Sequence, residues 1–173
     1  MKQSKVFIGL SNPKSPANVA SVMRAAGNYR VDAVFYSGQR YPRALALNPD
    51  TPKLSRRVGD EVPLTGVNDL FDALTDNMKI VCVEFAEDAI ALPGFQHPEN
   101  AFYVFGPEDG TLTQDVIDRA DAVVYVPTVG CMNLAATVNV LLYDRLSKSH
   151  LTIETNQLVR QSRDRNNNLR VKK

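Results

Sequence analysis

One segment, from Phe102 to Lys148, constrains the fold more than any other part of this 173-residue chain. It reads as an apolar strand at 102–105, a turn from Gly106 to Gly110, a helix, a second strand at 122–126, a glycine loop at 128–133 and a long apolar helix. Continuous apolar strands fit a sheet that is covered on both faces. Open α/β sheets bind ligands at the carboxyl ends of their strands. We therefore expect the two loops to build one pocket.

The rest of the chain continues the alternation of strands and helices, which favours an α/β fold with a mostly parallel sheet and helices on both faces. Prolines predict loops at 41–44 and 48–50. The predicted strands are 5–10, 32–36 and 79–85, and the predicted helices run from Pro16 or Ala17 to about 28, over 67–74 and over 52–58.

Several function classes are excluded by missing motifs. No GxGxxG follows the first strand and no GxxxxGK[ST] is present, which argues against a nicotinamide dehydrogenase and a P-loop nucleotidase. The two cysteines, Cys82 and Cys131, and the two histidines, His97 and His150, predict neither a disulfide nor a metal site. Without a signal peptide or a membrane-spanning apolar run, we expect a cytoplasmic protein.

Charge is unevenly distributed along the chain. The formal net charge is +1, but from Ser149 onward the chain has six basic and two acidic residues. We expect one domain over 1–150 and a basic, flexible tail over 151–173. A second group of basic residues lies at 40–57, and both groups suit contact with nucleic acid phosphates.

Three segments, in this order, resemble the motifs of the SpoU (TrmH) branch of the SPOUT RNA methyltransferases. They are NVASVMRAAGNYRVDAVF at 18–35, FGPEDGTL at 105–112 and VYVPTVGCMNLAATVNVLLYD at 124–144. The resemblance implies an α/β fold with a C-terminal deep trefoil knot. It also implies a homodimer that uses S-adenosylmethionine to methylate a ribose 2′-hydroxyl of RNA, with tRNA favoured over rRNA, and neither DNA nor a membrane as partner.

The resemblance also implies site residues. Arg24, Glu108, Asn133 and Asn18 match the family's catalytic positions, and Arg24 would bind RNA phosphate or help the 2′-hydroxyl in the partner chain's site. Backbone or side-chain contacts to the cofactor are expected from a larger set: Val83, Glu84, Phe105, Gly106, Pro107, Val126, Met132 and Leu134.

Each of these residues also has a purely structural interpretation. Arg24 could extend to solvent from an amphipathic helix. Asn18 and Asn133 could be helix caps, and Glu108 could bind the amides of its own turn. Glu84 could be an exposed charge at a strand end, and Tyr143 could be core.

The chain departs from the family pattern at Thr111, Cys131 and Ala135, where glycine, serine and serine are frequent. These departures keep open a knotted RNA-binding protein with a cofactor pocket and little catalysis. A third alternative is a small-molecule enzyme that uses Glu108 as acid or base.

Overall fold

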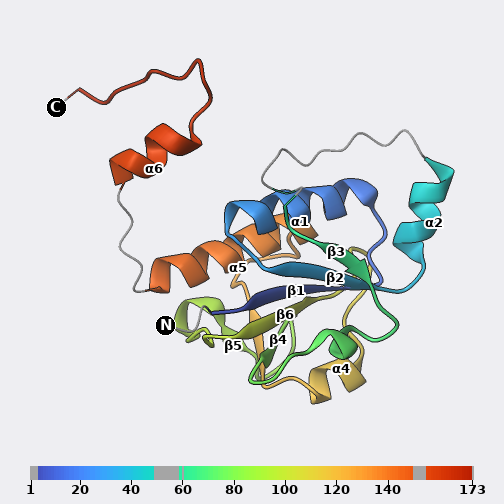
Figure 1. The fold of residues 1–173 in the computed structure, drawn as a ribbon. Coiled ribbons are helices and arrows are strands. Elements are labelled where there is room, and N and C mark those ends of the chain that lie inside the picture. Colours follow the sequence, from blue (N-terminus) through green and yellow to red (C-terminus); the bar gives the residue numbers. More distant parts are fainter. Residues whose placement is uncertain (1–3, 49–58, 60, 150–154, 173) are drawn as a thin grey trace.

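The protein is built on one parallel sheet. The structure, a computed structural model, describes residues 4–48, 59, 61–149 and 155–172. Within these residues seven strands pair in the order β3-β2-β1-β6-β4-β7-β5, and every pairing is parallel (Figure 1). The strands are β1 Val6–Ser11, β2 Ala33–Ser37, β3 Leu64–Gly66, β4 Lys79–Val83, β5 Ile90–Ala91, β6 Ala101–Phe105 and β7 Ala122–Tyr125. The prediction of a mostly parallel sheet is confirmed.

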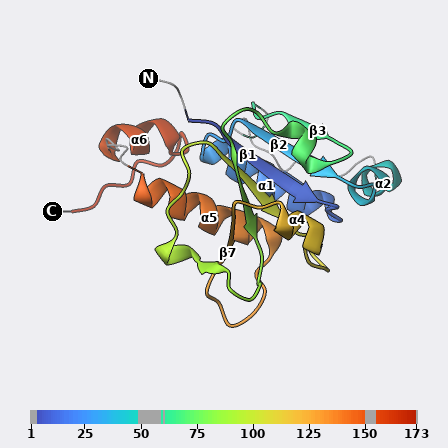
Figure 2. The same ribbon diagram turned by 90° about the horizontal axis from the view of Figure 1, so that it is seen from below.

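Helices cover both faces of the sheet, as predicted. In Figures 1 and 2, α1 and α5 lie side by side on one face, and α4 lies on the other. The α-helices are α1 Pro16–Asn28, α2 Arg40–Leu47, α4 Gln114–Asp118, α5 Leu134–Lys148 and α6 Thr155–Ser162, and two 3₁₀ turns are η1 Leu70–Ala73 and η2 Leu92–Gly94. No described helix is long and apolar enough to cross a membrane.

Strand β6 is the centre of the core. All five of its residues are buried, because Tyr103 and Phe105 join the core beneath α1 and α5 while Phe102 and Val104 join the core on the opposite face. This is the two-sided burial that the apolar run predicts. The Cys82 thiol is buried in the second core, forms no disulfide and donates to the Val116 carbonyl at 3.8 Å.

Each of the two long helices begins at a side-chain cap. Ser15 caps α1, since its side chain accepts from the backbone N–H of Asn18, and Pro16 occupies the first helical position. Asn133 caps α5 and accepts from the N–H groups of Ala135 and Ala136. The predicted start of α1 is confirmed.

The far end of α5 is tied to the segment after β5. Arg145 donates to the carbonyls of Pro98 and Glu99, and Lys148 donates to those of Leu92 and Phe95. These contacts hold residues 92–99 against the helix.

A nearby buried histidine strengthens this attachment. His97, with a side chain only 4% exposed, lies 2.7 Å from the Tyr103 hydroxyl and 2.8 Å from the Asp144 carboxylate. It therefore connects residues 92–99 to both β6 and α5.

Two local predictions were wrong. Residues 41–44 are not loop but the start of α2, because Pro42 lies in the first helical turn, where its missing N–H has no helical partner to lose. The helix predicted over 67–74 is only the turn η1. Asp69 caps this turn and the backbone of Leu74 is extended, so the helix cannot continue.

Several predictions fall on residues that the structure does not describe. The helix over 52–58, residues 49–50 of the predicted loop and the basic residues Lys53, Arg56 and Arg57 lie outside the described residues. The short helix of the tail is α6. The division at residue 150 and the trefoil knot stay predictions.

Candidate active site

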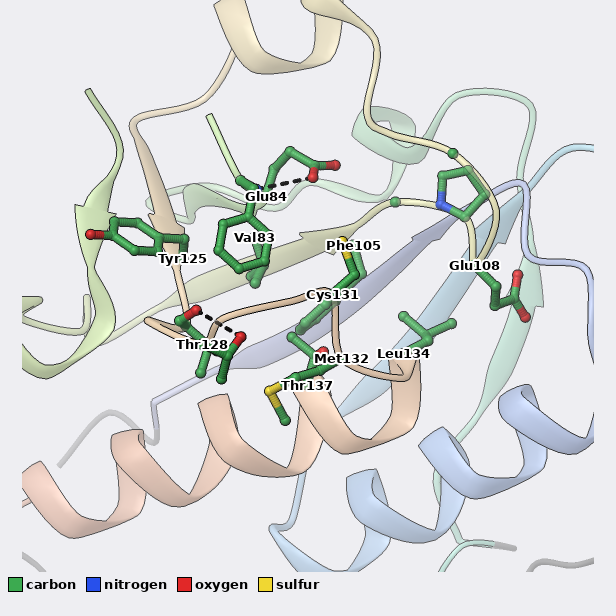
Figure 3. A pocket seen from close by; sticks show the side chains of 15 residues that line it. Val83, Glu84, Phe105, Glu108, Tyr125, Thr128, Cys131, Met132, Leu134 and Thr137 are labelled. Carbon is green, nitrogen blue, oxygen red and sulfur yellow. Dashed lines mark hydrogen bonds between the residues drawn. The ribbon is translucent and has the colours of Figure 1, made fainter. Parts of the chain in front are cut away.

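A cavity opens where β4, β6 and β7 end. Their carboxyl ends, the turn after β6 and the loop before α5 enclose about 700 Å³ when the open mouth is included. Figure 3 shows this cavity extending from Tyr125 on one side to Glu108 on the other. Its walls are formed by Val83, Glu84, Phe85, Phe105, Gly106, Pro107, Glu108, Gly110, Tyr125, Val126, Thr128, Cys131, Met132, Leu134 and Thr137. The glutamate turn and the asparagine loop thus share one cavity.

Glu108 is the acceptor for a loop that is far away in the sequence. Its Oε2 accepts from the backbone N–H of Lys14 at 2.8 Å, and its Oε1 accepts from the N–H of Ser15 at 3.0 Å and from Nδ2 of Asn18 at 3.1 Å. The carboxylate therefore fixes the loop before α1. The alternative that Glu108 serves only its own turn is wrong.

These contacts keep Glu108 ionised. Partial burial acts to raise the pKa of its carboxyl, but hydrogen bonds from Ser15, from its own N–H, from Lys14 and from Asn18 outweigh burial, and the pKa lies below its ordinary value. A carboxylate whose lone pairs are occupied and whose pKa is lowered is a poor proton carrier at neutral pH.

Asn18 connects this carboxylate to the second loop. Its Oδ1 accepts from Nδ2 of Asn133 at 3.0 Å, while its Nδ2 donates to Glu108. Asn18 lies in the first turn of α1 and is not its cap, which is Ser15. Asn133 is the cap of α5, so its structural interpretation is confirmed, and its Nδ2 also donates to Asn18 beside the cavity.

Glu84 holds the turn after β6 against the end of β4. Its Oε2 accepts from the N–H of Leu112 at 2.9 Å, and its Oε1 accepts from the N–H of Phe85 at 3.0 Å. The turn approaches closely at Gly106, where a Cβ would lie 3.2 Å from Glu84 Oε2 and 3.2 Å from the nitrogen of Leu112. Glu84 is thus a half-buried structural acceptor and not a free strand-end charge.

An exposed ion-pair cluster borders the cavity. Asp109, the residue after Glu108, binds Arg40 at 2.7 Å and Lys14 at 3.3 Å. The Arg40 guanidinium is the main cause that lowers the pKa of Asp109 to about 2, and Lys14 adds to it. Exposed pairs of this kind contribute little stability, so the two cations remain open to exchange for other anions.

Arg24 lies apart from the cavity. It is exposed on α1, outside the cavity walls, and makes no hydrogen bond or ion pair with any residue in the described part of the chain. Tyr143, on the adjacent helix α5, is 63% exposed, so the alternative that it packs in the core is wrong.

The predicted cofactor set lies together. Its eight members, from Val83 to Leu134, all line the cavity, and Glu108 lines it as well. Asn18 and Asn133 reach the site through hydrogen bonds, and their roles stay predictions. Among the described residues, no three His, Cys, Asp or Glu side chains gather as metal ligands.

Some site residues were missed by sequence reasoning. Phe85 and Tyr125 end or follow their strands, so strand position could have indicated them. Thr137 lies one helical turn after Asn133, and the i, i+4 spacing could have indicated it. Lys14 and Ser15 contribute backbone groups, which no sequence motif marks.

Comparison with known proteins assigns the chain to a family. The family model described as "SpoU rRNA Methylase family" matches residues 5–143. The chain belongs to the SpoU rRNA methylase family. The family resemblance found in the three motifs is therefore confirmed.

The relatives of this SpoU chain are longer than the chain itself. A Staphylococcus aureus protein assigned to the TrmH family of tRNA/rRNA methyltransferases is 26% identical over 162 residues, covering 87% of this chain and 64% of the relative. A Staphylococcus epidermidis relative of the same description is 27% identical, covering 86% of this chain and 61% of its own. The chain thus spans less than two thirds of the length of these relatives.

Solved SpoU structures share the fold. The TrmH/SpoU tRNA modifying enzyme of A. aeolicus has a TM-score of 0.69 at 15% identity, over 84% of this chain and 76% of that one. A structure reported under the description "Structural insights into the 2-OH methylation of C/U34 on tRNA" also has a TM-score of 0.69, at 21% identity. The match covers 86% of this chain and 92% of that one. AviRb of Streptomyces viridochromogenes, crystallised with AdoMet, has a TM-score of 0.66 at 16% identity, and the match covers 86% of this chain and 59% of AviRb. At these identities the likeness shows the fold.

Proposed function

We propose that this chain is an S-adenosylmethionine-dependent RNA methyltransferase that methylates a ribose 2′-hydroxyl, with tRNA as its substrate. The observation that carries the proposal is the hydrogen-bonded chain Glu108–Asn18–Asn133, which ties both motif loops to one cavity. Membership of the SpoU family supports the reaction class. The AdoMet bound to AviRb supports the cofactor, and the tRNA-modifying structures support the substrate.

The lining of the cavity fits S-adenosylmethionine. Small-molecule sites are mostly apolar with few polar groups. Val83, Phe105, Val126, Met132 and Leu134 supply apolar walls, and the carbonyls and N–H groups of the two loops supply polar contacts. When bound, the cofactor supplies an activated methyl group, so no protein nucleophile is needed.

The glycine turn is suited to close backbone contact with this cofactor. Gly106 has no side chain to occupy the space beside Glu84 and Leu112, where a Cβ would meet atoms at 3.2 Å. Backbone groups on either side of Gly106 can therefore approach a ligand. Glu84 holds the turn in place through Leu112 and has remaining lone pairs that can accept from a cofactor hydroxyl.

The chain's own residues position the acceptor ribose. Asn133, oriented by Asn18 and by the N–H groups it caps, presents a fixed polar group at the first turn of α5. Holding the 2′-oxygen in line with the methyl group is the main contribution that such a site can make. Glu108 orients Asn18 and does not act as acid or base, since its pKa is lowered and its oxygens are occupied.

Arg24 acts on the site of a second copy in this proposal. It lies outside its own chain's cavity, is exposed on α1 and has no hydrogen-bond or ion-pair partner among the described residues, and α1 packs beside α5, on which Tyr143 is exposed. A homodimer that pairs these surfaces would bring each Arg24 to the opposite cavity. There the guanidinium can bind phosphate with two hydrogen bonds and stabilise negative charge on the ribose oxygen.

The RNA is bound in part by basic groups. Arg40 and Lys14 border the cavity, and five basic residues against one acidic residue occupy the described tail, 155–172. Phosphate neutralisation by such groups supplies most of the non-specific affinity for RNA. We expect the protein to work in the cytoplasm, where tRNA is found.

A binding protein with little catalysis is the second candidate. Cys131 is exposed in the cavity wall, where family members often have serine, and Ala135 is buried at the other frequent serine position. Neither residue can supply the hydroxyl hydrogen bond of serine. This candidate predicts cofactor and RNA binding without methyl transfer.

Calorimetry with S-adenosylmethionine and transfer of labelled methyl groups to tRNA and rRNA pools distinguish these functions. The proposal expects cofactor binding, methylation of tRNA and a product with a blocked 2′-hydroxyl, read as resistance of one linkage to alkaline cleavage. Label in rRNA alone would assign the alternative substrate. Binding without label in either pool would establish the second candidate, and no cofactor binding would refute both.

Mixing two inactive variants tests the shared site. In a mixed dimer of Arg24→Ala and Asn133→Ala chains, one of the two sites has both intact residues. Random mixing should therefore restore about a quarter of the parent activity. If both variants bind the cofactor and dimerise as the parent does but the mixture stays inactive, Arg24 acts in its own chain's site.

A further inference from the structure

A second cleft lies at the same edge of the sheet, where β2 and β3 end. It encloses about 720 Å³ when its open mouth is included, the measure that gives about 700 Å³ for the first cavity, and it is called the β2–β3 cleft below. Gly38, Gln39 and Pro42 form one wall at the start of α2, and the other is formed by Gly66, Val67, Asn68 and Asp72. Tyr36, near the end of β2, lies between the walls with its ring edge-on to Tyr41. The cleft is separate from the cofactor cavity and shares no lining residue with it.

Two glycines keep this cleft open. A Cβ on Gly66 would lie 2.8 Å from Cζ and from the hydroxyl oxygen of Tyr36. Gly38 has φ +82, and a Cβ there would lie 2.3 Å from Oδ1 of Asn12. Any other residue at either position would push a cleft wall or Tyr36 out of place, so the geometry of the cleft depends on both glycines.

The cleft carries three exposed polar side chains without a partner in the described part of the chain. Gln39 and Asn68 provide two amides and Asp72 a carboxylate, and none of these side chains forms a hydrogen bond or ion pair with a residue in the described part of the chain. Amides present a donor beside an acceptor, and a carboxylate accepts from amino groups. These are the groups that pair with the edges of nucleobases.

Basic side chains lie between the two cavities. Arg40 directly follows Gln39 of the cleft, and its partner Asp109 directly follows Glu108 of the cofactor cavity. Lys14 binds the same carboxylate. Taking neighbouring strands as about 4.8 Å apart, the ends of β2 and β3 lie roughly 14 Å from those of β6 and β4. A nucleic-acid strand that spans both cavities would pass its phosphates over two cations.

We propose that the β2–β3 cleft binds one unstacked nucleobase of the RNA, close in sequence to the nucleotide that is methylated. Gln39, Asn68 and Asp72 read the edge of the base, and Lys14 and Arg40 bind the phosphate that leads to it. Recognition of single-stranded RNA takes this form, in which a splayed base meets hydrogen-bonding side chains beside an aromatic ring. The inference rests on the proposed RNA substrate and names a second site for it.

The double variant Gln39→Ala/Asn68→Ala tests the cleft. Both side chains are exposed and without partners, so the fold should be unaffected. We expect the KM for the tRNA pool to rise about tenfold, the loss of one bidentate base contact, with the cofactor Kd unchanged. Gln96→Ala, which removes an exposed amide outside both cavities, is the matched control and should match the parent.

A cleft-filling variant gives an independent test. Asn68→Phe places a ring in the cleft and should raise the KM for tRNA at least as much as the double variant. If both variants keep the parent KM for tRNA while the parent methylates it, the cleft proposal is overturned and the proposed function stands. If the parent binds the cofactor but no RNA, the proposed function fails, and the cleft proposal with it.

Discussion

Asn133 donates from Nδ2 to Oδ1 of Asn18 across 3.0 Å, and this bond joins the first turns of α5 and α1. Asn18 passes the connection on, since its own Nδ2 donates to Glu108 at 3.1 Å. An amide that donates at one end and accepts at the other fixes the orientation of both partners. The cap of α5, a side chain from the first turn of α1 and the glutamate of the turn after β6 therefore form a single unit beside the cavity.

Replacing Asn133 by serine should separate its two tasks. Serine caps helices as well as asparagine does, so the free energy of unfolding should stay within about 0.5 kcal/mol of the parent. Serine is too short to reach Asn18, and misplacement of the acceptor ribose should lower the methyl transfer rate by up to about 100-fold. Asn133→Ala is the comparison variant, because it also loses the cap. Full activity of the serine variant would show that the bond to Asn18 is not needed.

Glu108 should make the protein sensitive to acid. Its pKa is lower in the folded chain than its ordinary value of 4.5, so its stabilising effect is present at neutral pH and is lost as the pH falls below about 4.5. In Glu108→Gln the NH₂ group of the new amide replaces one carboxylate oxygen. It then faces an N–H group of Lys14, Ser15 or Asn18 and cannot accept a hydrogen bond from it. The loss at pH 7 should be about 1 kcal/mol, since the carboxylate is partly exposed. Urea unfolding of both proteins between pH 3 and pH 7 measures this, and equal pH profiles would contradict it.

Arg24→Ala should lower methyl transfer without lowering stability. The side chain is exposed and has no partner among the described residues, so its removal costs little folding free energy. Arg24→Lys keeps the charge but loses the planar fork, and it should recover only part of the activity. Turnover of tRNA and the thermal midpoint are the readouts. An active alanine variant would remove Arg24 from the proposed site.

Two glycine substitutions form a matched pair for cofactor binding. In Gly106→Ala the new Cβ would lie 3.2 Å from Glu84 Oε2 and from the Leu112 nitrogen, so the turn must move. We expect the Kd for S-adenosylmethionine to rise about tenfold, or 1.4 kcal/mol. Gly94→Ala has no heavy atom within 4 Å of its Cβ and should bind as the parent does. Equal affinities by calorimetry would place the cofactor elsewhere.

His97 should make stability depend on pH near neutrality. Burial lowers its pKa below 6.5, and Arg145 and Lys148 add to this against the opposing effect of Asp144, so the folded state favours the neutral ring. Stability is then complete above pH 6.5 and falls as the pH drops below it. The neutral ring also bonds Tyr103. In His97→Gln the unfolding free energy should be lower at pH 7.5 but should change less between pH 7.5 and pH 5.5. A parent that gains stability over this acid step would contradict the sign.

Patterns in the sequence were enough to predict the central strand of the sheet and the start of α1. The five buried residues of β6 form a continuous apolar run, and such a run has one solution, a strand covered on both faces. The start of α1 was also readable, because Ser15 and Pro16 are local signals of a helix start. The start of α2 was not, because Pro42 looks the same in a loop and in a first helical turn.

Exposure and long-range contacts required the structure. The sequence left open whether Tyr143 packs in the core, and the structure shows that it is 63% exposed because the buried face of α5 includes Val138, Leu141 and Leu142. Likewise, Glu84 sits at the end of an apolar strand in the sequence. Only the fold shows that it accepts from Leu112, 28 residues later.

The sequence by itself determined the five central strands to within about two residues, the loops that follow β6 and β7, and the family to which their motifs belong. Which groups meet at those loops was decided by the tertiary structure. Glu108 follows β6, whereas Lys14 and Ser15 follow β1, and they meet because β1 and β6 are parallel neighbours with Leu10 beside Phe105. Strand order results from packing and chain closure over the whole domain, and no local pattern around residue 14 or residue 108 contains it.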